Sequence, residues 1–345
     1  MTADRVTLAT LAQRLGVSIS TVSNAYNHPD QLSAATREKV FAAARELGYA
    51  GPDPRASALR RGRVGAIGLI EKSLPVALTD PASLLMLSGV AEACDEAGVA
   101  LVLIPRGQPD SGQADIVRTA VVDGFVAHCD ALDDGRRLIV EERRLPIVVL
   151  DGRPEPGEPS VGIDEEGGTY AAAEHLLQLG HRRLGVIAFA PHVFGQYNSG
   201  TSRRLDGYRR AVADAGVDPD ALTVVEGTFG DRAQVSGVVR RLLERPDPPT
   251  GLLAMSDEMA VAAIDAVHQL GLRVPEDVSV VGFDDTVTAR TSSPPLTTIR
   301  QPHAAKGAAA VRMLLGGSAG PREISFPVEL VVRGSSGPVS PVSRR

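Results

Sequence analysis

The sequence is poor in aromatic residues and cysteine. Of its 345 residues none is tryptophan, and Phe, Trp and Tyr together make up 3%. The two cysteines, Cys94 and Cys129, have no second Cys or His at the spacing of metal ligands. Because both lie in apolar segments, we interpret them as small buried hydrophobic residues. The sequence therefore predicts neither a metal site nor a cofactor.

Long hydrophobic runs and familiar catalytic motifs are also missing. No apolar run approaches twenty residues and residues 1–6 are polar, so we expect a cytoplasmic protein with neither a membrane span nor a signal peptide. The Walker, HExxH and GxSxG patterns are absent, and Gly62, Gly65 and Gly68 do not form the dinucleotide fingerprint GxGxxG. An enzyme is therefore not expected.

Charge is distributed unevenly along the chain. The net charge is -6, but residues 1–63 hold nine Lys and Arg against five Asp and Glu, so this segment is basic and the remainder is acidic. A basic segment at one end of an acidic chain is compatible with nucleic-acid binding by that segment alone.

Three short helices are predicted within this basic segment. Their apolar residues recur at helical spacing, and each begins at a hydroxyl residue suited to be an N-cap. The helices run from the N-caps Thr7, Ser18 and Ser33 to Gly16, Tyr26 and Leu47, respectively. Three helices in about 45 residues are typical of a helix-turn-helix module, whose second helix enters the major groove.

The second helix has side chains that suit base reading. Val22 and Tyr26 are expected to pack inward, which leaves polar and small apolar side chains outward that can contact adenine edges or thymine methyl groups. Thr21 and Arg37 suit phosphates, which fix register without reading sequence. The expected DNA contacts in this module are Thr7, Ile19, Ser20, Thr21, Ser23, Asn24 and Arg37. The alternative is that these are solvated positions of a small helical bundle.

Beyond a Pro- and Gly-containing break at residues 50–54, short apolar runs alternate with longer helical patterns. This alternation predicts an α/β body of two doubly wound, mainly parallel sheets, with a ligand crevice at the carboxyl ends of the strands. Strands are expected near residues 64–70, 100–104, 124–128, 147–150, 184–188, 223–226, 251–254 and 278–282, and helices near 82–97, 168–179, 204–215, 233–243, 258–270 and 303–315.

The chain as a whole resembles the lactose/galactose repressor (LacI/GalR) family of bacterial transcriptional regulators. The motifs that carry the resemblance span residues 5 to about 333 and include Val6–Ser18, Thr21–Asn24, Leu47–Tyr49, Arg204–Tyr208, Val274–Asp285 and Pro294–Thr298. The resemblance implies that Ile19, Ser20 and Asn24 face bases. Many family members have Arg where this chain has Asn24, so we expect an altered preference, for A·T, at that position.

The resemblance also divides the chain. It implies a helix-turn-helix domain at 1–50, a hinge at 51–62, a body at 63–335 similar to periplasmic binding proteins, and a disordered tail at 336–345. Within the body, one subdomain is expected to hold 63–162 and 291–322, and the other 163–290 and 323–333. Leu59 matches a leucine that wedges into the minor groove, which bends the duplex. Alternatively, Leu59 caps the core of the body.

In the body, the resemblance implies effector contacts by Arg204, Asp284 and Phe229. Ser256, Asp257 and Asp151 follow predicted strands and complete the expected set. A guanidinium supplies a rigid fork of donors and a carboxylate accepts hydroxyls or amines. The alternatives are that Asp257 is a helix N-cap, that Phe229 is core, and that Arg204 and Asp284 form a structural salt bridge.

The expected function is that of a repressor, whose affinity for double-stranded operator DNA changes with a small effector. The expected effector is a sugar or related polar metabolite, or alternatively a purine, and the low aromatic content weakens the case for a sugar. The family implies a homodimer, and the absence of a leucine heptad at the end of the chain favours a dimer over a tetramer. The rival functions are a solute-binding transport protein, which would share the body fold, and an activator.

Overall fold

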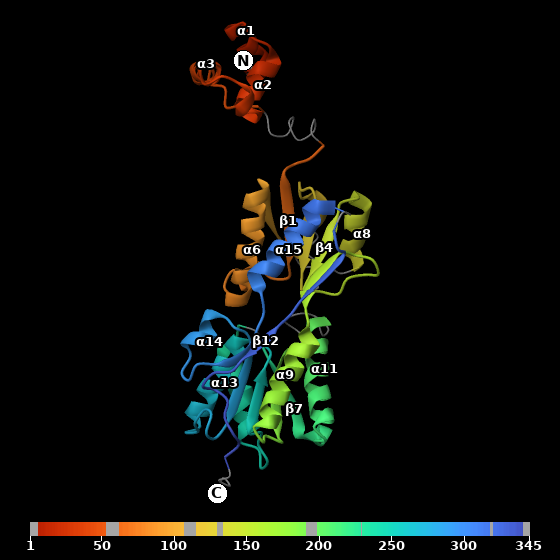
Figure 1. Ribbon diagram of the computed structural model, residues 1–345, viewed down its shortest axis with the longest axis vertical. Helices are drawn as coiled ribbons and strands as arrows, with labels where there is room; N and C mark the ends of the chain where they lie inside the picture. Colours follow the sequence, from red (N-terminus) through yellow and green to blue (C-terminus); the bar gives the residue numbers. More distant parts are fainter. Residues whose placement is uncertain are drawn as a thin grey trace. The chain divides into compact units, whose positions relative to one another are not determined.

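The computed structural model describes residues 6–52, 62–106, 115–129, 134–190, 199–228, 230–317 and 320–340. The chain falls into two compact units, Met1–Gly65 and Ala66–Arg345 (Figure 1). No helix within the described ranges is long and apolar enough to span a bilayer.

In its described residues, the first unit contains α1 (Leu8–Leu15), α2 (Ile19–Asn27), the 3-10 turn η1 (Pro29–Gln31) and α3 (Ala34–Glu46). All three predicted N-caps are confirmed, because the hydroxyls of Thr7, Ser18 and Ser33 each accept a hydrogen bond from the backbone N–H three residues later. The helices share one small core made of Leu11, Ala12, Val22, Ala25, Val40, Ala43 and Ala44. Local capping and helical spacing thus define this unit.

The second unit, the body, contains two subdomains, each built on a six-stranded sheet. The sheet of subdomain 1 has the order β11-β5-β4-β3-β1-β2, and its paired strands are parallel. Its strands are β1 (Ala66–Glu71), β2 (Ala100–Pro105), β3 (Phe125–His128), β4 (Ile147–Leu150), β5 (Ser160–Ile163) and β11 (Glu323–Phe326). The accompanying helices are α5 (Leu74–Ala77), α6 (Pro81–Ala97), α7 (Ile116–Thr119), α8 (Asp134–Arg143) and α15 (His303–Gly316).

The sheet of subdomain 2 has the order β12-β10-β9-β8-β6-β7 and is parallel except for β12. Its strands are β6 (Leu184–Phe189), β7 (Leu222–Gly227), β8 (Gly251–Ala254), β9 (Ser279–Asp284), β10 (Thr297–Arg300) and β12 (Glu329–Val331). Its helices are α9 (Glu165–Gln178), α11 (Ser199–Asp214), α12 (Arg232–Leu243), α13 (Asp257–Gln269) and α14 (Val287–Thr291), and a 3-10 turn, η2 (Pro219–Ala221), precedes β7. The two doubly wound sheets predicted from the sequence are therefore confirmed.

Helices α6 and α15 lie side by side over the sheet of subdomain 1 (Figure 1). Glycine permits this close approach, because a Cβ on Gly89 would lie 1.9 Å from the carbonyl oxygen of Ala304, and a Cβ on Gly307 would lie 2.4 Å from that of Met86. The pairing holds the start of α15, with His303 and Lys306, at the carboxyl end of the sheet.

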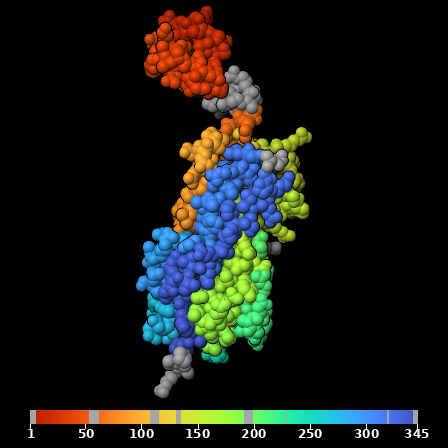
Figure 2. Space-filling model, in the orientation of Figure 1, coloured from red at the N-terminus to blue at the C-terminus, as the bar shows by residue number. Residues whose placement is uncertain are grey.

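The subdomain boundaries differ from those expected. Residues 297–300 form β10, which pairs with β9 in subdomain 2, whereas residues 323–326 form β11, which pairs with β5 in subdomain 1. The chain therefore crosses between the subdomains after β5, after β10 and after β11. Its C-terminal part, blue in Figure 2, consequently lies on both halves of the body. The short strands β5, β10, β11 and β12 were not predicted, because each has only three or four residues and none is a continuous apolar run.

The beginning of the expected disordered tail is packed. Ser335 is fully buried, its hydroxyl donates to the carbonyl oxygen of Val280, and the backbone N–H of Val339 donates to that of Leu179. The expectation of disorder from residue 336 is therefore wrong for residues 336–340, because backbone and side-chain hydrogen bonds hold this segment on subdomain 2. Residues 341–345 lie outside the described ranges.

Candidate functional site

Helix α2 presents a polar surface with one apolar side chain. Val22 and Ala25 are buried, whereas Ser20 is exposed and Ile19 keeps 52% of its surface accessible. Tyr26 is half-buried, as expected for an inward side chain, and its ring meets those of Phe41 and Tyr49 edge-on. Ile19 and Ser20 are thus available to a partner surface.

The other expected DNA-contacting side chains are partly engaged within the unit. The Ser18 hydroxyl lies 2.7 Å from that of Ser20 and 2.8 Å from that of Thr21, so the start of α2 is preorganised. The amide Nδ2 of Asn24 donates to Oε1 of Gln31 at 3.1 Å. A DNA base that contacts the Asn24 amide would therefore have to share it with Gln31 or displace the Gln31 side chain.

Of the remaining expected DNA contacts, two lie at other helices, one lies on α2, and one lies outside the described residues. Thr7 caps α1 in a reciprocal arrangement with Thr10, and Arg37 is exposed on α3. Ser23 is half-buried, and its hydroxyl and carbonyl oxygen accept from the amide of Asn27. Leu59 lies outside the described residues.

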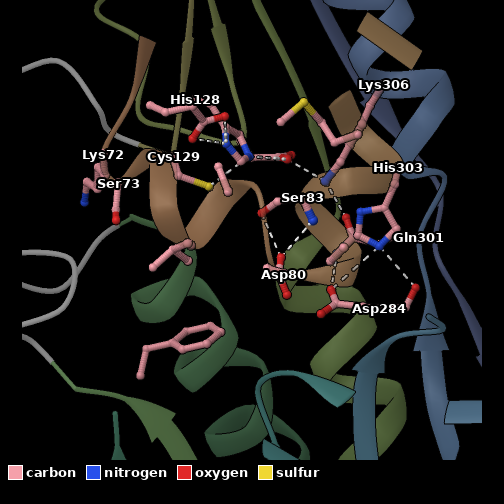
Figure 3. A pocket seen from close by; sticks show the side chains of 18 of the residues that line it. Lys72, Ser73, Asp80, Ser83, His128, Cys129, Asp284, Gln301, His303 and Lys306 are labelled. Carbon is pink, nitrogen blue, oxygen red and sulfur yellow. Dashed lines mark hydrogen bonds and ion pairs between the residues drawn. The ribbon is translucent and has the colours of Figure 1, made fainter. Parts of the chain in front are cut away.

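The body contains a cavity of about 150 Å³ lined by residues of both subdomains (Figure 3). It lies where the strands of both sheets end, as expected for doubly wound sheets. Cys129, Asp151 and Asp284 line it at strand ends with backbone φ angles of 50°, 52° and 118°, respectively. A positive φ angle costs conformational free energy for any residue other than glycine. Residues held in this conformation are concentrated at ligand sites. Strain of this kind marks the cavity as a candidate binding site.

Four ionisable side chains form a chain of contacts along the wall of subdomain 1. Glu71, His128 and Asp151 end or directly follow the adjacent strands β1, β3 and β4, so the parallel register brings them together. Both carboxylate oxygens of Glu71 lie 3.0 Å from Nδ1 of His128, whose Nε2 is 3.7 Å from Oδ2 of Asp151. Nζ of Lys306, on α15, lies 2.5 Å from the same Oδ2.

These contacts set the charges of the wall. Burial lowers the pKa of His128, but the neighbouring Cys129 and Glu71 outweigh burial and raise it well above its usual value. Burial raises the pKa of Asp151, but Lys306 and His128 outweigh burial and lower it. The wall therefore alternates acidic and basic side chains, in the order Glu71, His128, Asp151 and Lys306.

Cys129 does not fit the sequence interpretation of a buried hydrophobic residue. Cys94 is buried in the core, but Cys129 is only partly buried, lines the cavity and has its Sγ 3.1 Å from Nε2 of His128. The expectation failed because Cys129 directly follows strand β3, and the apolar sequence of the strand does not show which way the next side chain points. Figure 3 shows the thiol beside the His128 ring.

The wall of subdomain 2 is organised around Arg204, on α11. Its Nε donates to Oε2 of Glu165 at 2.6 Å, its Nη1 donates to the carbonyl oxygen of Met255, and its guanidinium carbon lies 3.8 Å from the ring centroid of Phe283. Arg204 is 8% exposed, so most of its orientation is fixed before any ligand binds.

Asp284 lies at the end of β9, opposite subdomain 1. Burial raises its pKa well above the usual value, although Arg204 counteracts this. Gln301 donates through Nε2 to Oδ1 of Asp284 and accepts through Oε1 from Lys306. Because Gln301 lies in the crossing between β10 and α15, it links the charged walls of the two subdomains.

His303, at the start of α15, lies close to the same carboxyl group (Figure 3). Its Nε2 is 3.2 Å from the carbonyl oxygen of Asp284, and burial and the charge of Lys306 lower its pKa to about 3. His303 is therefore neutral near pH 7 and can offer a ligand one ring nitrogen without adding charge.

The cavity collects three of the six expected effector contacts, namely Asp151, Arg204 and Asp284. The ion-pair partner of Arg204 is Glu165, not Asp284. Phe229 lies outside the described residues.

Ser256 and Asp257 do not line this cavity. The hydroxyl of Ser256 caps α13, and the buried carboxylate of Asp257 accepts from the backbone N–H and hydroxyl of Thr286 and from the hydroxyl of Thr298. The sequence placed both residues at the correct strand end but could not show that Asp257 points into the subdomain. Its contacts join α13 to β10, and burial raises its pKa to about 7.

Several lining residues escaped the sequence analysis. Glu71 and His128 end apolar strands, so the criterion that selected Asp151 would also have found them. Glu165, Gln301, His303 and Lys306 required knowledge of where the chain crosses between subdomains. No three His, Cys, Asp or Glu side chains in the described part of the chain are arranged as a metal site.

The comparisons with known proteins agree with both units. Residues 7–51 match the model for bacterial regulatory proteins of the lacI family, and residues 173–336 match a periplasmic binding protein-like domain. An HTH-type transcriptional regulator of Mycolicibacterium smegmatis is 38% identical over 331 residues, which cover 90% of each chain.

Two solved structures extend the similarity to almost the whole chain. The lac repressor dimer bound to operator and the anti-inducer ONPF has a TM-score of 0.79 and 30% identity, and the match covers 97% of this chain and all of that one. A complex of the transcriptional regulator CelR with cellobiose has a TM-score of 0.68 and 31% identity, and covers 96% of this chain and all of that one. With its helix-turn-helix unit and two-sheet body, this chain belongs to the LacI family and is a DNA-binding transcriptional regulator.

Proposed function

We propose that the protein is a repressor whose affinity for operator DNA is set by a small hydroxyl-rich molecule held between the two subdomains. The observation that carries this proposal is that Asp151 of subdomain 1 and Arg204 and Asp284 of subdomain 2 line one cavity. A ligand that contacts both walls favours one relative position of the subdomains, and a change in that position alters DNA binding by population shift.

The lining favours a sugar or polyol over a purine. Arg204, Lys306 and Gln301 supply donors, and Asp151 and Asp284 supply carboxyl groups that accept hydroxyls. Phe189 is the only aromatic ring besides His128 and His303 among the described lining residues, which gives a purine little to stack on. The CelR relative binds cellobiose, and a volume of about 150 Å³ suits a ligand of monosaccharide size.

A thermal-shift screen of the full chain against sugars, polyols and nucleobases tests the ligand class. A ligand at 100 times its Kd stabilises the folded protein by about 2.7 kcal/mol, which raises Tm by several degrees. The hit should then change operator affinity about 5- to 150-fold in a fluorescence-anisotropy titration. Screens in which only nucleobases stabilise the protein would contradict the proposed class.

The site itself is tested by Asp284→Ala. This variant should lose the thermal shift and the change in operator affinity, but should bind operator as the wild type does, because the helix-turn-helix unit is untouched. Asp206→Ala is the matched control, since Asp206 lies two residues after Arg204 on α11 and its side chain is 61% exposed. A variant D284A that responds normally to the ligand would contradict the assignment.

The proposed DNA surface consists of Ile19, Ser20 and Asn24, supported by Thr7, Thr21, Ser23 and Arg37, with Leu59 as the minor-groove wedge. Asn pairs with adenine through two edges, so we expect an A·T preference at the base facing Asn24. In a selection from random DNA, Asn24→Arg should shift that position towards guanine, whereas Gln13→Arg, which adds the same charge to α1, should not. Identical preferences for wild type and N24R would argue against this reading.

We further propose that the repressor acts as a homodimer in the cytoplasm and releases its ligand unchanged. A two-fold dimer presents two recognition helices to two half-sites, as in the lac repressor dimer on its operator. Doubling the distance between half-sites or deleting one half-site should weaken binding strongly, and analytical ultracentrifugation should give twice the chain mass.

A further inference from the structure

His128 lies between two groups in the arrangement that activates a thiol. Its Nδ1 lies 3.0 Å from both oxygens of Glu71, and its Nε2 lies 3.1 Å from Sγ of Cys129. A nucleophile within hydrogen-bond distance of a base, with the base oriented by a third group, is the geometry of an activated nucleophile. Figure 3 shows the His128 ring with the Cys129 thiol on its cavity side.

The surroundings stabilise the charged pair that a proton transfer from Cys129 to His128 produces. Glu71 and His128 are 5% and 8% exposed, so water screens their attraction weakly. Burial lowers the pKa of His128, but its interactions with Cys129 and Glu71 outweigh burial and raise it well above the usual value. Asp151 and Lys306 neutralise each other next to the ring and leave the Glu71 charge to stabilise the imidazolium.

The thiol also borders a space that a ligand can enter. Cys129 lines the cavity together with Asp151, whose side chain is only 7% exposed and whose Oδ1 has no hydrogen-bond partner in the described part of the chain. A buried acceptor without a donor is costly, so a ligand donor that gains access to this atom stabilises the complex. A thiol beside an unsatisfied acceptor suits a small electrophile that carries a hydroxyl or amide.

We propose that Cys129 is a nucleophilic thiolate that is covalently modified by small polar electrophiles of the α,β-unsaturated carbonyl class. This site goes beyond ligand binding, and its regulatory effect rests on the proposed function of the cavity. An adduct occupies the space of the ligand, so the modified repressor no longer responds to it.

The reaction is an addition without a leaving group. The Cys129 proton passes to Nε2 of His128, and the thiolate sulfur attacks the β-carbon of the electrophile to form a C–S bond. The electron pair of the C=C bond moves to the α-carbon, which takes up the proton from the His128 imidazolium. The product is the thioether, the imidazole is restored, and no oxidant or reductant is consumed. Glu71 acts through His128 and is a positioning residue.

Labelling of the full chain with acrylamide at pH 7, followed by peptide mass analysis, tests the proposal. An ordinary thiol is only a few per cent ionised at pH 7. Because His128 lies close enough to accept the proton of the thiol, Cys129 should react about tenfold faster than a model-peptide thiol. Cys94 is the internal control, because it is buried in the core and burial raises its pKa, and it should stay unlabelled.

Substitutions show whether Cys129 is labelled because His128 activates its thiol or only because the thiol is accessible. His128→Gln should slow labelling of Cys129 about tenfold, Glu71→Gln should slow it less, and Cys94→Ala should leave it unchanged. If H128Q does not fold, the thiolate ultraviolet absorbance of the wild type minus that of Cys129→Ser at pH 7 decides the question without altering His128. A Cys129 that reacts no faster than the peptide thiol, or that lacks the thiolate absorbance, overturns the proposal.

The regulatory consequence has its own readout. The acrylamide adduct should lose the thermal shift with the ligand, whereas acrylamide-treated Cys129→Ser should keep it. Labelling is measured by mass and needs no ligand, so a reactive Cys129 with no ligand found leaves the covalent site standing and contradicts the proposed function. A ligand-responsive protein with an inert Cys129 contradicts only the covalent site.

Discussion

The two walls of the cavity hold their buried charges in different ways. In subdomain 1, Glu71, His128, Asp151 and Lys306 alternate in sign, and each contacts a neighbour of opposite charge. In subdomain 2, Arg204 pairs with Glu165 and also attracts Asp284, which accepts a hydrogen bond from Gln301 and interacts with Asp257 of the same sign. The first wall is balanced, and the second carries an excess of acid.

The difference predicts opposite responses to pH. The lowered pKa of Asp151 contributes stability above about pH 4 that is lost as the pH falls, and the raised pKa of His128 contributes stability below about pH 6.5 that is lost as the pH rises through its folded-state value. The raised pKa of Asp284 contributes stability only at acid pH and loses it as the pH rises above about 4. The shifted pKa of Asp151 therefore stabilises the protein at neutral pH, whereas the shifted pKa of Asp284 destabilises the protein at neutral pH.

The largest effect should come from breaking the balanced wall with Lys306→Met. Lys306 is 3% exposed, and its removal leaves the buried Asp151 carboxylate with only the more distant His128, at 3.7 Å, as an ion-pair partner among the described residues. Loss of one partner of a buried pair costs about 3–5 kcal/mol. Urea unfolding at pH 7 should show this loss, and Asp151→Asn combined with K306M should recover much of it. Equal losses in the single and double variants would show that the pair is not a unit.

A smaller effect of opposite sign is expected on the acidic wall. Asp284→Asn keeps the shape and the acceptor for Gln301 but removes the unfavourable charge, so it should raise the free energy of unfolding at pH 8. At pH 4 the wild-type carboxyl is protonated and the gain should vanish. Asp151→Asn is the control and should destabilise the protein at pH 8. A gain for D284N that does not depend on pH would mean that charge is not its cause.

The helix-turn-helix unit shows what the sequence can determine. Thr7, Ser18 and Ser33 each cap a helix through a bond that spans three residues, so cap and helix start are encoded together. The sequence also locates Asp284 and Asp151, because Asp284 ends and Asp151 directly follows a strongly apolar strand. Their presence in the cavity could therefore be predicted from strand order alone.

Tertiary pairing accounts for what the sequence could not determine. Residues 297–300 and 323–326 exchange subdomains relative to expectation, since a four-residue strand does not reveal its sheet. This exchange places Gln301, His303 and Lys306 in the site. Asp257 failed as a site residue for the same reason, because its partners Thr286 and Thr298 are 29 and 41 residues away.

The smallest effect concerns the charge that connects the two walls. Asp80 caps α6 on subdomain 1, accepts from the N–H and hydroxyl of Ser83, and adds to the forces that raise the pKa of Asp284. Asp80→Asn preserves a good N-cap, so its own cost should be small. In a double-mutant cycle with Asp284→Asn at pH 8, the coupling should be about 0.5–1 kcal/mol of mutual repulsion.

That repulsion favours separation of the walls, so D80N should also bind a bridging ligand more tightly, by about 2- to 5-fold for this coupling. Asp231→Asn changes another N-cap aspartate, that of α12, and should show no coupling to Asp284. Because Asp80 and Asp284 lie on different subdomains, the cycle measures interaction across the cavity rather than within either wall. Zero coupling at pH 8 would show that the excess acid of subdomain 2 is confined to its own wall and does not oppose closure.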